Sequence, residues 1–252
     1  MEYKLRGKIF AYRLLILVFI LITWELSSRI VHQIFLAPPI AVFSLLPTIW
    51  FYPNFIEHLY VTFIEIFLAF LLSTASGLML GFALGIWKLL RDTYEPILST
   101  FYSIPNVVFY PLLLLLFGLD IASKIAFAYL LSFFPIVLTT MQAVTQVDRL
   151  LIKVAYAMGA SKLTTFYKVI IPASLPTIMS GITTGLALCV TGVIVGEMLG
   201  GIKGLGVLIA SAATLFDTPH YFLYVIIVVI IALLVSYVGK LFERLGGEVY
   251  KV

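Results

Sequence analysis

Charged residues are scarce in this sequence. Only 11% of its 252 residues are charged and 62% are hydrophobic, with a mean hydropathy of +1.14. Soluble domains average about 25% charged residues, so the composition excludes an ordinary soluble protein and indicates an integral membrane protein. The net charge of +4 is spread along the chain rather than gathered in a patch, and it gives no support to nucleic-acid binding.

Cysteine and histidine are also rare. The single cysteine, Cys189, excludes an intrachain disulfide and lies in an apolar run where a small packing residue fits. His32, His58 and His220 all fall in segments assigned below to the outer side of the membrane. We expect them at the membrane interface and predict no bound metal.

The sequence lacks the common catalytic and nucleotide-binding signatures. Segment 196–203 (GEMLGGIK) has glycines and a lysine, but its spacing differs from that of a phosphate-binding loop and no Ser or Thr follows for magnesium. Neither a zinc-protease His-Glu-x-x-His nor a nucleophile elbow is present. We therefore expect a non-enzyme that binds no cofactor itself.

Long apolar runs dominate the chain instead. A membrane helix needs about 20 apolar residues, and six segments fit that description. We place them at about 12–31, 57–86, 97–117, 122–144, 173–198 and 221–241. The basic N-terminus is followed by no small-residue cleavage site, so the first segment is predicted to be an uncleaved helix. The predicted fold class is an all-α polytopic membrane protein with a single transmembrane domain, residues 1–252.

The basic residues sort by membrane side. With the N-terminus in the cytoplasm, 13 of the 16 lysines and arginines fall on cytoplasmic segments, and only Arg29, Lys124 and Lys203 fall outside. No other assignment sorts the charges as well. We predict a multi-pass protein of the cell membrane, in contact with lipid, with both termini and residues 87–96 and 145–171 in the cytoplasm.

Two outer segments are expected to be irregular. Segment 32–56 contains four prolines, which forbid a continuous helix and indicate a structured external turn. Segment 200–222 is apolar and glycine-rich, and both a re-entrant dip into the membrane and a plain external loop fit it.

Glycines recur every four residues on two of the predicted spans. This spacing makes a smooth strip on one helix face, which lets another backbone approach closely. We expect tight packing of the second and fifth spans, within one subunit or between two copies. The glycines are Gly77, Gly81 and Gly85, then Gly181 and Gly185, then Gly192 and Gly196.

Two carboxylates lie at membrane depth or near it, where they are costly. Glu65 is about 12 Å along the second span, and Glu197 is at the outer end of the fifth. Each is either a hydrogen-bonded structural group or part of a substrate path. Thr183, Thr184 and Thr191 are further candidates for that path, although their hydroxyls can equally bond to their own backbone.

The segment from Asp148 to Pro176 is a polar island with internal order. Asp148 is placed to cap a short helix, which Gly159 ends in a left-handed turn, and Ser161 is placed to cap a second helix. A simple connector needs none of this. We expect the segment to dock onto another protein, the alternative being a packed loop that closes its own bundle.

This segment resembles the coupling motif of ABC-importer permeases, which runs Glu-Ala-Ala, three residues, Gly, nine residues, then Ile-x-Leu-Pro. Here Lys153, Val154 and Ala155 stand at the first position, Gly159 follows after three residues, and VIIP ends the motif at Pro172. The leading glutamate of the family is Lys153 in this chain, which reverses the charge there. Lysine is a good helix former, so the helix–glycine–helix geometry is unaffected.

Other segments carry the same resemblance across nearly the whole chain. The run Gly159, Ala160, Ser161 and the later Pro-x-x-x-Pro are similar to the subgroup that serves nitrate, sulfonate, taurine and thiamine-precursor importers. Segments 36–50, 117–124 and 195–209 are also similar to that subgroup.

The resemblance implies a permease subunit of an ATP-driven importer. Two permease copies, expected as a homodimer, would pair with two ABC ATPase subunits that carry ATP and Mg²⁺. An external binding protein would deliver a small solute, either an anion such as nitrate, sulfonate or taurine, or a vitamin precursor. The coupling loop, residues 148–172, would contact the ATPase through Lys153, Val154, Ala155, Gly159, Ala160, Ser161 and Pro172.

The rival hypothesis is a secondary transporter or channel that needs no ATPase. Its hallmarks are inverted repeats, paired broken helices and several intramembrane charges. The sequence shows no internal repeat, and Glu65 is the only deep charge that we expect.

The topology generates the first testable prediction. Cysteine labelling at positions 88, 162 and 203 should find the first two in the cytoplasm and the third outside, because this arrangement keeps most basic residues inside. A cysteine at position 162 that is labelled from the outside would contradict the topology.

Overall fold

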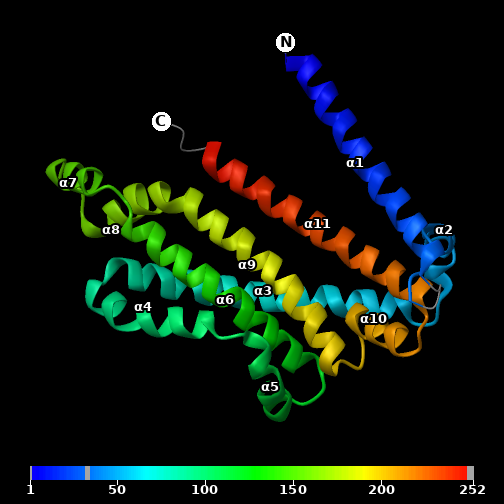
Figure 1. Cartoon of the computed structure of the whole chain (residues 1–252). Helices are drawn as coiled ribbons and strands as arrows, with labels where there is room; N and C mark the ends of the chain where they lie inside the picture. The colour runs from blue at the N-terminus through cyan, green and yellow to red at the C-terminus, as the bar shows by residue number, and fades with distance from the viewer. Residues whose placement is uncertain (1, 32–34, 249–252) are drawn as a thin grey trace.

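The computed structural model describes residues 2–31 and 35–248, and within them every regular element is a helix. Figure 1 shows long, roughly aligned helices joined by short ones. In chain order the elements are α1 (Glu2–Ile30), α2 (Pro39–Ser44), η1 (Ile49–Phe51), α3 (Phe55–Ile86), α4 (Lys88–Ser103), η2 (Asn106–Phe109), α5 (Tyr110–Phe117), α6 (Ile121–Thr145), α7 (Arg149–Ala157), α8 (Lys162–Thr165), the π-turn η3 (Phe166–Ile170), α9 (Ile171–Gly200), α10 (Leu205–Thr214) and α11 (Thr218–Glu248).

Among the described residues, five helical segments are long and apolar enough to cross a membrane. They confirm five of the predicted spans, and they lie in α1, in α3, in α6, in the continuous helix Lys162–Gly200, and in α11. The sixth span exists only if the segments Lys88–Ser103 and Asn106–Phe117 are taken together, and these are bent by 88°.

The prediction of a single helix at about 97–117 is therefore wrong. The break lies at Ile104, whose backbone is extended (φ −72°, ψ 133°). Pro105 follows, and the ring of a proline disfavours the helical conformation in the residue before it. Residues 87–96, which we predict to lie in the cytoplasm, are mostly helical, because α4 begins at Lys88 and only Trp87 separates it from α3.

The glycines of α3 form a face onto which α6 packs. A Cβ built on Gly81 would lie 2.5 Å from the Cβ of Thr140, which is closer than two carbon atoms approach without displacement. The two helices can therefore touch only because these side chains are absent. The contacts pair residues four apart on both helices: Gly77 with Ile136, Gly81 with Thr140 and Gly85 with Val144.

The glycines of α9 pack on the same helix from another side. A Cβ on Gly181 would lie 2.7 Å from the Cβ of Thr139, and one on Gly192 would lie 2.7 Å from the Cα of Ala128. The glycine strips of the second and fifth spans thus both face α6, the fourth span, rather than each other. The sequence marks which helices pack closely, but the partner helix has no glycine signal of its own.

The end of the bundle opposite α7 consists of short elements (Figure 1). Between α1 and α3 the chain forms only α2 and η1 among the described residues, as the prolines predict. In segment 200–222 the chain forms α10, which packs against α9 and α11 and buries Leu205, Leu208 and Ile209. Whether α10 enters the membrane stays a prediction.

The opposite end carries α7 and α8 (Figure 1). The last turns of α11 lie toward this same end, as the predicted topology requires. Helix α1 diverges from the bundle toward its N-terminal end, and between residues 11 and 30 most of its apolar side chains are exposed. Trp24 links it to the rest of the chain by donating a hydrogen bond from Nε1 to the carbonyl of Ala37 (3.0 Å).

Gly81→Leu should destabilise the subunit itself. The added side chain would force α3 and α6 apart, and overpacking of this kind costs about 1–3 kcal/mol or more. Thermal unfolding in detergent measures the effect, with Ala75→Leu, an exposed position on the same helix, as the matched control. Equal melting temperatures for the two variants would contradict the packing described.

Candidate functional site

The loop between α6 and α9 has the caps that its sequence predicts. Asp148 accepts a hydrogen bond from the backbone N–H of Leu150 (2.8 Å) at the start of α7, and Ser161 accepts one from Thr164 (3.2 Å) at the start of α8. Gly159 lies between them with φ +82°, a left-handed conformation. A Cβ there would have no neighbour within 4 Å, so the position needs glycine for its backbone conformation and not for space.

We predicted that the second helix of this loop ends before the fifth span begins. The structure shows instead that the two are continuous. Helix α8 runs through the π-turn η3 directly into α9, so that one helix extends from Lys162 to Gly200. Proline has no N–H to bond to the carbonyl four residues earlier, and Pro172 sits at the start of α9. The π-turn before it, in which the N–H of Ile171 bonds to the carbonyl of Phe166, lets the helix continue.

The solvent-exposed surface of this loop carries many apolar side chains. No residue of α7 is buried, and Met158 keeps 83% of its surface exposed. Lys153 and Ser161 are exposed, whereas Ala155 and Ala160 are half-buried. Several exposed apolar side chains gathered on one short segment indicate an interaction surface. Its members are Leu150, Leu151, Val154, Met158, Leu163 and Tyr167.

A second constellation lies buried between α3, α6 and α9. The Nζ of Lys124 is 2.9 Å from Oε1 of Glu65, and both side chains are almost completely buried. The expectation that Glu65 is the only deep charge is therefore wrong, and Lys124, which the topology assigns to the outer side, is buried and paired. Both residues are flanked by apolar residues in the sequence. Their pairing becomes visible only in the structure, where α3 and α6 lie close together.

Glu197 joins this cluster from α9. Its two oxygens accept hydrogen bonds from Oγ1 of Thr62 (2.6 Å) and from the backbone N–H of Gly206 (2.7 Å). Thr62 in turn accepts one from the N–H of Leu205 (2.9 Å). The cluster therefore ties the start of α10 to α3 and α9, and it has no exposed member among Thr62, Glu65, Lys124 and Glu197.

Gly204 shows how closely the chain passes this cluster. Its φ is +124°, and a Cβ there would lie 2.1 Å from the carboxyl carbon of Glu197. Its N–H donates to Nδ1 of His58 (3.0 Å). Glu197 is hydrogen-bonded through both oxygens, whereas Glu65 is held by its ion pair with Lys124, and its Oε2 has no hydrogen-bond partner among the described residues.

The three threonines of α9 that we named as candidates for the path do not share one face. Thr184 and Thr191 are exposed, and their hydroxyls donate to the carbonyls of Ser180 (2.9 Å) and Ala187 (3.1 Å). Thr183 instead lines an apolar cavity of about 600 Å³ between α3, α9 and α11. Its hydroxyl also donates to its own helix, to the carbonyl of Met179 (2.9 Å).

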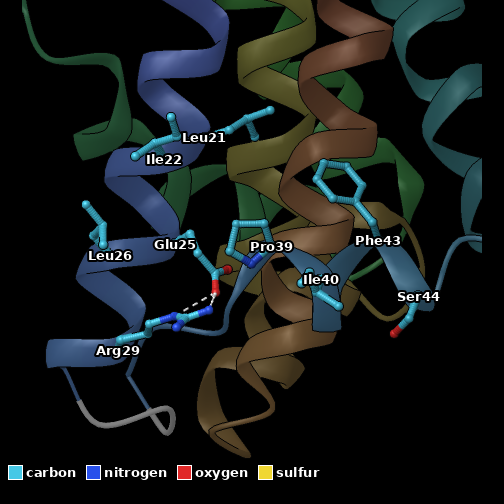
Figure 2. A pocket seen from close by; sticks show the side chains of 9 residues that line it. All are labelled: Leu21, Ile22, Glu25, Leu26, Arg29, Pro39, Ile40, Phe43 and Ser44. Carbon is cyan, nitrogen blue, oxygen red and sulfur yellow. Dashed lines mark hydrogen bonds and ion pairs between the residues drawn. The ribbon is translucent and has the colours of Figure 1, made fainter.

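The sequence did not predict a groove of about 870 Å³ between α1 and α2. Figure 2 shows apolar side chains from both helices along it, with Arg29 paired to Glu25 (2.8 Å) at one edge. The groove exists because α1 stands away from the bundle, a tertiary feature without a local sequence signal.

Two of the three histidines have partners near the outer end. His58 contacts Gly204 as described, and Nδ1 of His220 lies 2.7 Å from Oδ2 of Asp217. His32 lies outside the described residues. Within residues 2–31 and 35–248, no group of three or more His, Cys, Asp or Glu side chains is placed to hold a metal ion.

Comparison with known families decides the class of the protein. The profile described as "binding-protein-dependent transport system inner membrane component" matches residues 75–245, which is more than half of the chain. The chain belongs to this family. The match includes the coupling loop and the three helices that meet at the buried cluster, α3 in part and α6 and α9 in full.

Named members of this transport family are similar along most of the chain. The formylaminopyrimidine transport permease protein ThiX of Halalkalibacterium halodurans is 32% identical over 85% of this chain and 86% of its own length. The taurine transport permease TauC of Escherichia coli is 28% identical over 87% and 82%. The riboflavin transport permease RibX of Chloroflexus aurantiacus is 39% identical over 62% of this chain, which spans 58% of the length of that relative.

The fold is also that of solved ABC permeases. An inward-facing structure of the MetNI methionine ABC transporter superposes with a TM-score of 0.68 at 21% identity, covering 79% of this chain and 98% of that one. The family match and the relatives confirm the expected family, and the superposition confirms the fold.

Lys124→Met should destabilise the protein strongly. It leaves a buried carboxylate without its counter-charge, and breaking such a pair costs about 3–5 kcal/mol. The double variant Glu65→Gln/Lys124→Met should recover much of this loss. Lys203→Met is the control, because Lys203 pairs with Glu57 at the surface, where an ion pair contributes about 0–1 kcal/mol. Similar melting temperatures for Lys124→Met and Lys203→Met would contradict a structural ion pair.

Proposed function

We propose that this chain is the membrane subunit of an ATP-driven importer, which moves a small solute delivered by an external binding protein. The observation that carries the proposal is the loop α7–α8. It is capped at both helix starts, turned by a left-handed glycine, apolar on its exposed surface and continuous with a membrane-length helix. Membership of the binding-protein-dependent transport family supports it.

The proposed partner at this loop is a separate ABC ATPase, present in two copies. The described residues contain no nucleotide-binding signature, which fits a division of labour in which ATP and Mg²⁺ are held by the ATPase. Helix α7 connects the end of α6 to the start of α8, and α8 leads into α9 without a break. Movement of a docked α7 would therefore act on two membrane helices at once.

The proposed translocation path runs along the exposed face of α9 that carries small and polar side chains. Residues of this face recur every three or four positions, as one side of a helix requires. We propose that a second copy of the chain, forming a homodimer, encloses the path. The reason is that lipid tails offer no hydrogen-bond partners to a row of hydroxyl groups. The face comprises Thr177, Ser180, Thr184, Ala187 and Thr191.

Glu65 and Glu197 have a different role in this proposal. They hold the outer ends of α3, α6, α9 and α10 together, so that these helices move as a unit. The alternative of a secondary transporter without ATPase is not favoured. Its charged groups would have to exchange partners during transport, whereas the three buried charges among the described residues are bonded within the protein.

We infer the class of substrate from the solutes for which the relatives are named. Those relatives are named for transport of riboflavin, formylaminopyrimidine, taurine and, in Bacillus subtilis, aliphatic sulfonates. We propose a solute of the same size range, either a small anion or a vitamin precursor.

Gly159→Val should uncouple ATP hydrolysis from transport while leaving membrane insertion intact. A branched side chain in the left-handed region costs about 1–2 kcal/mol and would turn α7 away from its direction. Transport and ATPase activity of the reconstituted complex are the measurements. Ala173→Val, an exposed helical position in α9, is the control. Normal coupled transport by Gly159→Val would remove the main support for the coupling role.

A further inference from the structure

The segment from α7 to η3 exposes positive charges as well as apolar side chains. Arg149, Lys153, Lys162 and Lys168 are exposed, and none of them forms an ion pair with any residue that the structure describes. The one acid of the loop, Asp148, is engaged in capping α7. The docking surface therefore carries an uncompensated positive charge.

The charges and the apolar residues occupy different sides of α7. Successive residues of an α-helix are about 100° apart, so residues four apart share a side. Arg149 and Lys153 lie on one flank, and Leu150, Val154 and Met158 lie on the adjacent flank. The half-buried Ile152 and Ala155 fall on the side opposite to both. The free half of the helix is thus divided lengthwise into a basic flank and an apolar flank.

We propose that α7 docks in a cleft of its ATPase that is apolar on its floor and carries carboxylates along one wall, facing Arg149 and Lys153. This inference rests on the proposed function and adds the chemistry of the partner. Burial of the apolar flank gives affinity in proportion to area. The basic flank then sets the direction in which α7 enters the cleft and disfavours ATPases whose wall is positive.

An anionic membrane surface is the other candidate for these two flanks, because a helix with a basic side and an apolar side can also lie in a membrane interface. The third side of α7 is half-buried against the chain, Asp148 caps its start, and Gly159 ends it in a left-handed turn, so α7 is held in a fixed direction. This fixed placement favours a structured protein cleft, and the membrane is one outcome of the test below. A structured protein cleft can match both flanks at once.

The test uses the ABC ATPase that co-purifies with the wild-type chain, with the permease held in lipid nanodiscs. Arg149→Glu/Lys153→Glu should weaken binding on the order of tenfold, because two attractions become repulsions. Wild-type affinity should also fall as salt rises from low to moderate concentration. Lys240→Glu, at an exposed lysine of α11, makes the same kind of charge change away from the loop and should leave the affinity unchanged.

Zero-length cross-linking tests the contact itself. A carbodiimide activates a carboxylate, and a lysine amine in contact displaces the urea to form an amide. Mass spectrometry should find Lys153 joined to an Asp or Glu of the ATPase in the wild-type complex. Lys153→Arg should keep the affinity and lose this cross-link, since a guanidinium does not react.

The outcomes separate this inference from the proposed function. If no ATPase binds the wild-type chain, the proposed function fails and the inference fails with it. If the ATPase binds but charge reversal has no effect and Lys153 forms no cross-link, the importer assignment stands and the acidic wall is refuted. If reversal weakens binding only in nanodiscs that contain anionic lipid, the basic flank belongs to the membrane and the inference is overturned.

Discussion

The close approach of α6 to the glycine faces of α3 and α9 is the constraint on which the rest of the structure depends. A single Cβ at Gly81, Gly185 or Gly192 would stand within 2.7 Å of an atom of α6. Van der Waals packing of this kind is the main source of helix association in a membrane, where the hydrophobic effect between helices is absent. The three helices therefore form a packed unit, and the other helices are arranged around it.

Both functional regions are attached to this unit. At one end it brings Lys124 of α6 to Glu65 of α3, with Glu197 of α9 beside them, and this places α10 through the hydrogen bond from Gly206. At the other end the loop α7–α8 is connected to α6 on one side and to α9 on the other. A force applied to α7 thus reaches α6 and α9, two of the three closely packed helices, and it does so through continuous helix on the α9 side.

Sequence reasoning succeeded where the determinant is local. Apolar runs identified five spans, Asp148 and Ser161 were placed correctly as caps, and Gly159 was placed correctly in its left-handed turn. A cap or a left-handed residue acts within one turn of helix, so its signal is contained in a few neighbouring letters. The break before Pro105 had such a local signal too, which the length of the apolar run concealed.

What the sequence concealed depends on contacts between distant residues. The pairing of Glu65 with Lys124 joins residues in different helices, and neither shows its partner in its own neighbourhood. The same holds for the glycines, which mark a face but not the helix that covers it. The continuity of α8 with α9 was missed for another reason. A proline usually ends a helix because it has no N–H to donate. Here the π-turn before Pro172 lets the helix continue without that hydrogen bond.

The central claim is that this chain moves solute only together with a separate ATPase. Native mass spectrometry of the complex, released from the membrane in which the chain is naturally expressed, tests it most directly. Two copies of the chain with two copies of one ABC ATPase is the composition that we predict. A chain that is released without any ATPase, and that still transports solute when reconstituted alone, would contradict it.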